Sequence, residues 1–279
     1  MRILKILILT ILLFSFSPFQ AFADKSDDTL VIAFSREITN LDYHYGTKTE
    51  YLILGDMIDD SLFYVENENL TYAPSLASDF NVVDDVTLDV NLRQGVKFHD
   101  GSEMTSDDVV YTYNFIVTND KNRRHKKLAS WLKSIEKTGK YSVRFNLNSP
   151  YANLFNDLYR IKIRKNGIMG TDGNWDDNAQ ATSLNGLGPY KVISFDPGVE
   201  VVLERNESYF GGPKGNPAIK NLIIRSIPDM GTQQAELMSG GIHWMYNVKK
   251  DVGEAMAKTG KADYQIGPSL RIGFLVLDA

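Results

Sequence analysis

The segment 92–116, LRQGVKFHDGSEMTSDDVVYTYNFI, constrains the fold more than any other part of the chain, because strand, turn and helix signals follow one another within it. Leu88, Val90 and Leu92 alternate with polar residues, which is the period of two expected of a strand with one buried face. The pair Asp100-Gly101 is typical of a tight turn. The sequence therefore predicts a half-buried strand, followed by a sharp reversal of the chain.

A helix is predicted shortly after this turn. Thr105 stands where a helix needs an N-cap oxygen. Asp107 and Asp108 fall in the first turn, where carboxylates interact favourably with the positive end of the helix dipole. We expect the helix to begin at Ser106 and to end at about Val117.

Three stretches of the chain, in the same order, resemble the extracellular solute-binding proteins of family 5. These proteins deliver oligopeptides, dipeptides, nickel complexes and some sugars to ATP-driven bacterial importers. The first stretch is the segment 92–116, and the second is Gly186–Phe210, GLGPYKVISFDPGVEVVLERNESYF. The third is Ile224–Met245, IRSIPDMGTQQAELMSGGIHWM. The resemblance covers the chain from about Leu30 to its last residue.

This resemblance implies an α/β fold, namely a two-lobed periplasmic binding protein of the type II kind. The chain is expected to supply the first lobe and an inserted small subdomain, with the second lobe missing. We assign residues 1–23 to a signal peptide, 24–62 to the first part of lobe I, 63–184 to the inserted subdomain and 185–279 to the continuation of lobe I up to the hinge. Residues 270–279 read as an apolar strand that stops without a turn or a polar tail, so we expect the chain to be truncated.

The first elements after the leader are a strand and a helix. Thr29–Ser35 is a continuous apolar run, as in a strand covered on both faces. Four apolar residues then follow a spacing of three and four and predict a helix with one buried face: Leu54, Met57, Ile58 and Leu62. Three carboxylates lie off that face, and we expect them to be solvated: Asp56, Asp59 and Asp60.

Later elements follow from alternation and from glycine. Strands are expected at Tyr141–Leu147, Val199–Leu203, Leu222–Ile227 and Ile242–Asn247. A helix is expected to begin at Asp229 and to end at Gly240-Gly241. The basic run 121–127 is expected to be a solvated loop without function.

The beginning of the chain has the features of a secretory signal peptide. Arg2 and Lys5 give a charged start, Ile3–Phe16 is nearly all apolar, and Ala21-Phe22-Ala23 fits a cleavage site, so that the mature chain begins at Asp24. The apolar run is shorter than the roughly 20 residues of a membrane-spanning helix. The sequence contains no cysteine, so no lipid-bearing cysteine follows the leader. We therefore expect a periplasmic protein without a lipid anchor.

Composition and motifs argue against several other classes of protein. A formal net charge of −5 disfavours nucleic acid as a partner. The chain lacks G-x-S-x-G, and no two of its four histidines have the spacing of a metal-binding pair on one helix. Asp172, Asn174 and Asp176 begin a calcium-loop pattern, but Asp177 and Ser183 stand where glycine and glutamate are needed. We expect no enzyme activity, no catalytic residue, no metal and no cofactor.

The resemblance implies that a ligand lies between the two lobes, with two segments of the first lobe beside it. These are Gly46-Thr47-Lys48-Thr49 and Tyr246-Asn247. Hydroxyls of Thr47 and Thr49 could bond a peptide backbone, Lys48 could face a carboxylate, and Tyr246 could supply an aromatic shelf. The alternative is that these are ordinary loop residues. We expect Tyr246 and Lys48 to matter for ligand binding and little for folding.

The function that follows is capture rather than catalysis. We interpret the chain as the periplasmic substrate-binding component of an ABC transporter that captures short peptides for import. Its partners are then an inner-membrane ABC permease and ATPase complex, and the full-length protein is expected to be a monomer. Two alternatives stay open: another ligand of the same family, such as a nickel complex or an oligosaccharide, and, from a different class, a secreted hydrolase.

Overall fold

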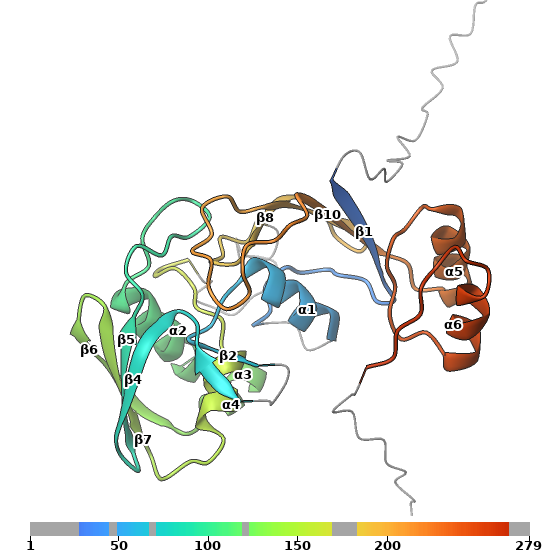
Figure 1. Cartoon of the computed structure of the whole chain (residues 1–279). Helices are drawn as coiled ribbons and strands as arrows, with labels where there is room; N and C mark the ends of the chain where they lie inside the picture. The colour runs from blue at the N-terminus through green and yellow to red at the C-terminus, as the bar shows by residue number, and fades with distance from the viewer. Residues whose placement is uncertain (1–27, 45–48, 67–70, 119–122, 169–182, 268–279) are drawn as a thin grey trace, which may run out of the picture.

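The computed structural model describes residues 28–44, 49–66, 71–118, 123–168 and 183–267, and every structural statement below refers to these residues. They form two four-stranded sheets and one two-stranded sheet. Figure 1 shows the two larger sheets in different halves of the molecule, with helix α1 between them. Several predicted features lie outside the described residues: the signal peptide 1–23, Thr47, Lys48, the loop at Asp172 and the strand 270–279.

The first sheet contains the strand predicted at the beginning of the chain. Its order is β1 (Thr29–Phe34), β10 (Asn221–Ser226), β9 (Glu200–Arg205) and β8 (Tyr190–Asp196). β1 runs parallel to β10, and the remaining pairs are antiparallel. The carboxyl ends of β1 and β10 therefore meet at one edge of the sheet.

Both faces of β1 are buried, as the continuous apolar run predicts. Ile32 and Phe34 pack in one apolar core, which includes buried side chains of α1 (Thr49–Ile58). Val31 and Ala33 pack in a second core on the opposite face. That second core includes side chains of α5 (Met230–Ser239) and α6 (Lys250–Ala257). Figure 1 shows these two helices beside β1, at the end of the molecule away from the second sheet.

Helix α5 has the ends that the sequence predicts. Asp229 is its N-cap, and its Oδ1 accepts the backbone N–H of Thr232 at 2.7 Å. Gly240 is the C-cap and adopts a φ of 86°, which glycine reaches without strain. No helix in the described part of the chain is long and apolar enough to cross a membrane.

The strand predicted at 242–247 is wrong. Only Trp244 makes a bridge, to Ile32 of β1, and the segment otherwise has no regular ladder. The carbonyl of Val31 accepts N–H groups from both His243, at 2.8 Å, and Trp244, at 3.2 Å, which is not a strand register. Asn247 then has a φ of 61°, so the backbone leaves the extended region. Alternating apolar residues alone could not reveal either feature.

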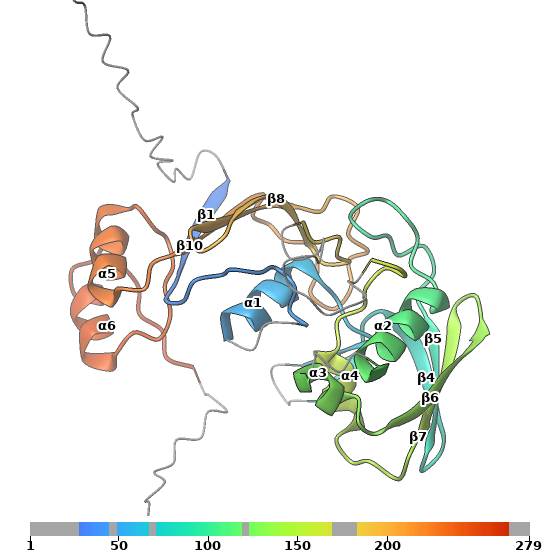
Figure 2. The same ribbon diagram turned by 180° about the vertical axis from the view of Figure 1, so that it is seen from behind.

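The second sheet is entirely antiparallel and has the order β4 (Ala77–Asp84), β5 (Thr87–Leu92), β7 (Ser142–Leu147) and β6 (Leu132–Gly139). Figure 2 shows α2 (Ser106–Thr118) lying across one face of this sheet. The remaining elements of this half are β2 (Phe63–Val65), β3 (Tyr72–Pro74), α3 (Arg123–Leu128) and α4 (Leu154–Arg160). This half has its own apolar core. The subdomain limits that we assign at 63 and 184 stay a prediction.

The start of α2 agrees with the sequence. Thr105 Oγ1 accepts the N–H of Asp107 at 3.3 Å, and Asp108 Oδ2 accepts the N–H of Thr105 at 2.7 Å. These reciprocal bonds satisfy backbone donors at the helix start. The loop predicted at 121–127 is wrong in part, because α3 begins at Arg123. This helix ends beside Trp131, whose indole N–H donates to the Leu128 carbonyl at 2.6 Å.

The turn 186–189 joins the two halves by close backbone contact. The N–H of Gly188 donates to the carbonyl of Ile58 at 2.8 Å. A Cβ atom at position 188 would lie 2.4 Å from the Ile58 carbonyl carbon, and one at position 186 would lie 2.1 Å from the Ile58 oxygen. Glycine is required at both positions because any side chain would push the turn away from the end of α1.

We predict that Gly188→Ala lowers the free energy of unfolding by about 1–3 kcal/mol, because the added methyl group overlaps backbone that cannot easily move. Urea denaturation measures the change. Gly267→Ala is the matched control, since a Cβ atom there meets nothing within 4 Å; its effect should stay within about 0.5 kcal/mol. Equal effects of the two substitutions would show that the close contact at Gly188 carries no stability.

Candidate ligand-binding site

The candidate ligand-binding site lies at the carboxyl end of β1, where two segments distant in sequence meet. Tyr246 donates its hydroxyl to Oε1 of Glu50, the second residue of α1. Ser35, which follows β1, donates its hydroxyl to the same oxygen at 3.4 Å. Glu50 is only 3% exposed. In open α/β sheets, ligands bind outside the carboxyl ends of the strands, so this position suits a binding site.

Aromatic rings cover this edge. The Tyr246 ring stacks on Trp244, with centroids 5.6 Å apart and an interplanar angle of 16°. The same ring packs edge-to-face on Phe34, with centroids 5.8 Å apart and an interplanar angle of 80°. Trp244 is 44% exposed, whereas Tyr246 is half-buried. The site therefore presents one indole ring to the outside, supported from behind by a second ring.

The structure brings some of the predicted site residues together. Thr49 is exposed and immediately precedes Glu50, the partner of Tyr246, and Asn247 is exposed directly after Tyr246. Thr47 and Lys48 lie outside the described residues. The expectation that Tyr246 matters little for folding needs correction, because its hydroxyl satisfies a buried carboxylate and its ring packs on the core residue Phe34.

Sequence reasoning missed Glu50 and Trp244. A glutamate in the first turn of a helix is common, and nothing in the sequence indicates that this one is buried. Trp244 could have been found, since residues 244 and 246 point to the same face of an extended segment while Met245, which is buried, points to the other. The aromatic pair would then have been predicted as one surface.

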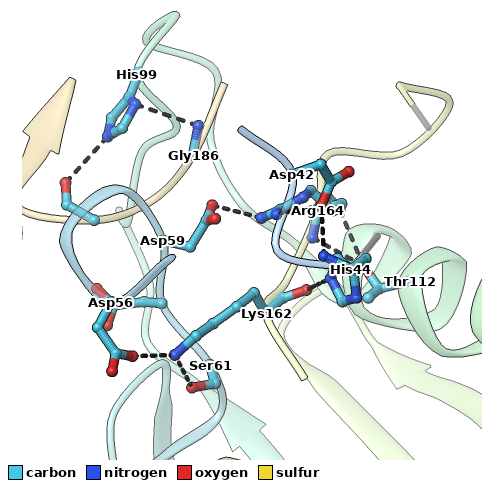
Figure 3. A network of polar contacts seen from close by, with 12 residues as sticks. Asp42, His44, Asp56, Asp59, Ser61, His99, Thr112, Lys162, Arg164 and Gly186 are labelled. Atoms are coloured by element: carbon cyan, nitrogen blue, oxygen red, sulfur yellow. Dashed lines mark hydrogen bonds and ion pairs between the residues drawn. The ribbon is translucent and has the colours of Figure 1, made fainter. Parts of the chain in front are cut away.

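A second polar feature is a buried charge cluster between the two halves of the molecule, centred on Arg164 (Figure 3). Arg164 is fully buried, with Nη2 2.9 Å from Oδ1 of Asp42 and Nη1 2.5 Å from Oδ1 of Asp59. Both carboxylates are also fully buried. The Lys162 side chain is 1% exposed, and its Nζ lies 2.5 Å from Oδ1 of Asp56. These pairs join α1 and the loop before it to residues 162–164, which follow α4 in the half of the molecule that contains the second sheet.

The prediction that Asp56, Asp59 and Asp60 are solvated is wrong. Asp59 and Asp60 are 0% and 1% exposed, and Asp56 is about one-third exposed but paired with Lys162. Asp60 Oδ1 lies 2.8 Å from Lys214 Nζ, and its Oδ2 accepts the hydroxyl of Tyr209 at 3.0 Å. Helix α1 ends at Ile58, so the helical face that we extrapolated no longer applies to residues 59 and 60.

Burial and charge act in opposite directions on the two carboxylates beside Arg164. Burial by itself raises the pKa of Asp42, but the adjacent guanidinium and the N–H of His44 outweigh it and lower that pKa to about 2. Burial prevails at Asp59 and raises its pKa to about 6, because Arg164 is shared and the charge of Asp42 is close. One cation thus faces two carboxylates, of which Asp59 accepts a proton more readily.

Three of the histidines make hydrogen bonds to backbone groups. His44 is buried, with Nε2 2.8 Å from the Lys162 carbonyl. His99 Nδ1 accepts the N–H of Gly186 at 3.2 Å, and its Nε2 lies 3.1 Å from the Gly188 carbonyl. Burial lowers the pKa of His99 to about 4, so the ring is neutral at pH 7. His243 Nδ1 accepts the N–H of Val31 at 3.2 Å.

Within the described ranges, no three histidine or carboxylate side chains converge in a way that could hold a metal ion. What the carboxyl edge of β1 does offer is an aromatic surface with hydroxyl, amide and backbone groups beside it, which suits reversible binding.

Residues 71–279 match the bacterial extracellular solute-binding proteins, family 5 Middle. This match confirms the resemblance, and the chain belongs to family 5 of the bacterial extracellular solute-binding proteins. The oligopeptide-binding protein AppA of Bacillus subtilis is 32% identical over 219 residues, which cover 77% of this chain and 36% of that relative.

Solved structures agree with this family. The structure of B. subtilis AppA in complex with a nonapeptide superposes with a TM-score of 0.73 at 30% identity, covering 84% of this chain and 45% of that one. NikZ from Campylobacter jejuni, in complex with Ni(L-His), has a TM-score of 0.65 at 26% identity, covering 77% and 42%. The mixed α/β fold of the periplasmic solute-binding proteins is thereby confirmed, and the chain spans less than half the length of these relatives.

We predict that Arg164→Met lowers the free energy of unfolding by about 3–5 kcal/mol, because two buried carboxylates lose their cation. Arg144→Met is the matched control. Arg144 pairs with Asp89 at 2.6 Å, but the two side chains are 42% and 35% exposed, so its loss should cost less than about 1 kcal/mol. Denaturant titration compares the two variants. Similar small losses would mean that the cluster does not hold the two halves together.

We predict a pH dependence that Asp59→Asn removes. Between about pH 6 and its ordinary value of 3.8, Asp59 holds a proton in the native state that it has released in the unfolded state. The free energy of unfolding therefore rises as the pH falls through this window, by about 1.4 kcal/mol per unit at most. The asparagine variant lacks this contribution. The difference between the free energies of unfolding of the two proteins at each pH therefore isolates Asp59, because the effect of His99 is common to both.

The measurement is chemical denaturation at pH 7, 6, 5 and 4 for both proteins. Stability of the wild type relative to Asp59→Asn should increase on acidification. Below the ordinary value of 3.8 the opposite sign is expected from Asp42, whose lowered pKa stabilises the native state only while it stays ionised. A difference that is constant from pH 7 to 4, or that decreases, would show that Asp59 is ionised throughout.

Proposed function

We propose that the chain is part of a periplasmic substrate-binding protein that captures short peptides for an ATP-driven importer. The observation that carries this proposal is the stacked pair of exposed Trp244 and half-buried Tyr246 at the carboxyl end of β1, with Thr49 and Asn247 close by. Support comes from the similarity to AppA, whose solved structure is a complex with a nonapeptide.

The chemistry of this edge suits an extended peptide. Peptides in extended form are held through backbone hydrogen bonds, with aromatic surfaces and a few charges selecting side chains. In this proposal Thr49 and Asn247 exchange hydrogen bonds with a ligand backbone, and Tyr246 and Trp244 contact a side chain of the ligand. We extend the same proposal to Thr47 and Lys48, which precede α1 in the sequence.

The cellular location and the partner proteins belong to the same proposal. Secretion through the leader 1–23 would deliver the protein to the periplasm, where an inner-membrane permease and ATPase complex takes up the ligand. We propose that the full-length protein acts as a monomer without a cofactor. Binding and release, rather than a chemical step, would then be its entire task.

A nickel complex is the second candidate ligand, because NikZ in complex with Ni(L-His) is among the similar structures. The described histidines give it little support, since His44, His99 and His243 already bond backbone groups. An oligosaccharide and a hydrolytic activity remain the other outcomes of the test. Peptide recovered in shortened form would establish the hydrolase instead.

We predict that the longest product of the gene binds short peptides and leaves them intact. Isothermal calorimetry with peptides, a nickel–histidine complex and an oligosaccharide distinguishes the ligands, and mass spectrometry of the recovered peptide detects cleavage. Tyr246→Ala should weaken peptide binding by about 1–3 kcal/mol. Tyr72→Ala is the control, because Tyr72 is 37% exposed on β3, in the other half of the molecule.

Tyr246→Ala should also lower the free energy of unfolding by about 1–3 kcal/mol, because Glu50 loses a hydrogen-bond donor while it stays buried. Thermal melting therefore accompanies each titration, at a temperature where the variant is fully folded. Peptide affinity unchanged in the folded variant would remove Tyr246 from the site. Binding of nickel–histidine and not of any peptide would overturn the assignment of the ligand.

A further inference from the structure

Glu50 is in an unusual position for a carboxylate. It is 3% exposed, and no ion pair to it exists among the described residues. Among the described residues, the hydroxyls of Tyr246 and Ser35 both donate to Oε1 of Glu50. A buried carboxylate is costly unless hydrogen bonds hold it in place. These contacts indicate that the role of Glu50 is to hold the side chain of Tyr246.

The chain of contacts from Glu50 leads to the surface. Glu50 bonds the hydroxyl of Tyr246, the Tyr246 ring stacks on Trp244, and Trp244 is 44% exposed. A charged acceptor makes a stronger hydrogen bond than a neutral one. Together with the edge-to-face contact on Phe34, this bond fixes the Tyr246 ring at both its edge and its hydroxyl.

The backbone of Trp244 is fixed as well. Its N–H donates to the carbonyl of Val31 at 3.2 Å, and its carbonyl accepts the N–H of Ala33 at 2.9 Å. Neighbouring Met245 is buried on the opposite side of the segment. Trp244 thus cannot withdraw into the core without breaking its bonds to β1, and its ring rests on a tyrosine that is itself held. Rigid rings lose little conformational entropy when a ligand binds.

We propose that Glu50 is a positioning residue that holds Tyr246 and Trp244 as one rigid aromatic surface, and that this surface selects ligands carrying a flat aromatic side chain. This inference rests on the proposed function, and it adds a preference that the fold alone does not define. Trp244 is the residue that contacts the ligand side chain. Glu50 and Tyr246 determine the orientation of the Trp244 ring.

The test compares affinities for two kinds of peptide of the same length. One is an alanine peptide, and the other carries phenylalanine at each position in turn. The wild-type protein, in its longest natural form, should bind the best phenylalanine peptide about threefold to tenfold more tightly than the alanine peptide. Trp244→Ala should reduce this ratio to about one. Ile193→Ala is the matched control. Ile193 is 59% exposed and lies on β8, which is the outermost strand on the other side of the sheet from β1.

Two further variants test the role of Glu50. Tyr246→Phe keeps the ring but removes the bond to Glu50, so the ratio should fall at least twofold although both rings remain. Glu50→Gln retains a neutral acceptor, so its ratio should lie between those of the wild type and Tyr246→Phe. Near-ultraviolet circular dichroism reports on the stacked pair, and its signal should weaken in the same order. A merely structural role would change the melting temperature and leave the affinity ratio unaltered.

The outcomes separate the two proposals. If the wild type binds no peptide, the proposed function is wrong. If it binds peptides but Trp244→Ala retains the full preference for phenylalanine, the aromatic surface is not the selecting site. If Trp244→Ala loses the preference while Tyr246→Phe keeps it, Glu50 does not position the surface. A loss in Glu50→Gln without a loss in Tyr246→Phe would mean that the carboxylate meets the ligand directly, which also overturns the inference.

Discussion

The structure depends on one buried cation shared by two carboxylates. Arg164 joins Asp42, in the loop before α1, to Asp59, directly after α1, and all three side chains are fully buried. Thr112 of α2 exchanges two hydrogen bonds with the backbone of Arg164, at 2.9 Å and 3.2 Å. Removing the guanidinium would leave two buried carboxylates without their cation, which is far more costly than the net gain from the pairs. The relative position of the two sheets is therefore set by polar contacts of defined geometry.

The turn 186–189 supports the same junction from the other side. His99 bonds both Gly186 and Gly188, and Gly188 bonds the last residue of α1. Leu184 packs in the core of the first sheet, and Leu187 in the core of the second. Apolar burial provides the stability of each half, whereas these directional bonds determine how the halves meet. Helix α1 connects this junction to the candidate site at the carboxyl end of β1, so the junction also determines where that site lies.

Local chemistry made several elements predictable. The start of α2 followed from Thr105, and both ends of α5 followed from Asp229 and Gly240, because caps act within one turn. The buried strand β1 followed from its apolar run. Asp59 was misjudged because its partner Arg164 is distant in the sequence, and no periodicity reveals a long-range ion pair. Tyr246 was assigned to the site by resemblance, whereas Glu50 was missed because its burial depends on Tyr246 and Ser35, which come from other segments.

The parallel pairing of β1 with β10 also limits the order in which the two sheets can form during folding. Thr29 and Asn221, at the beginning of these strands, are 192 positions apart. Every pairing of the second sheet, by contrast, lies between residues 77 and 147. A polypeptide that emerges from its amino terminus exposes β1 long before β10 exists, and closing so long a loop carries an entropic cost that local hairpins avoid. The strand beside the ligand edge must therefore stay unpaired until nearly all the described chain is available.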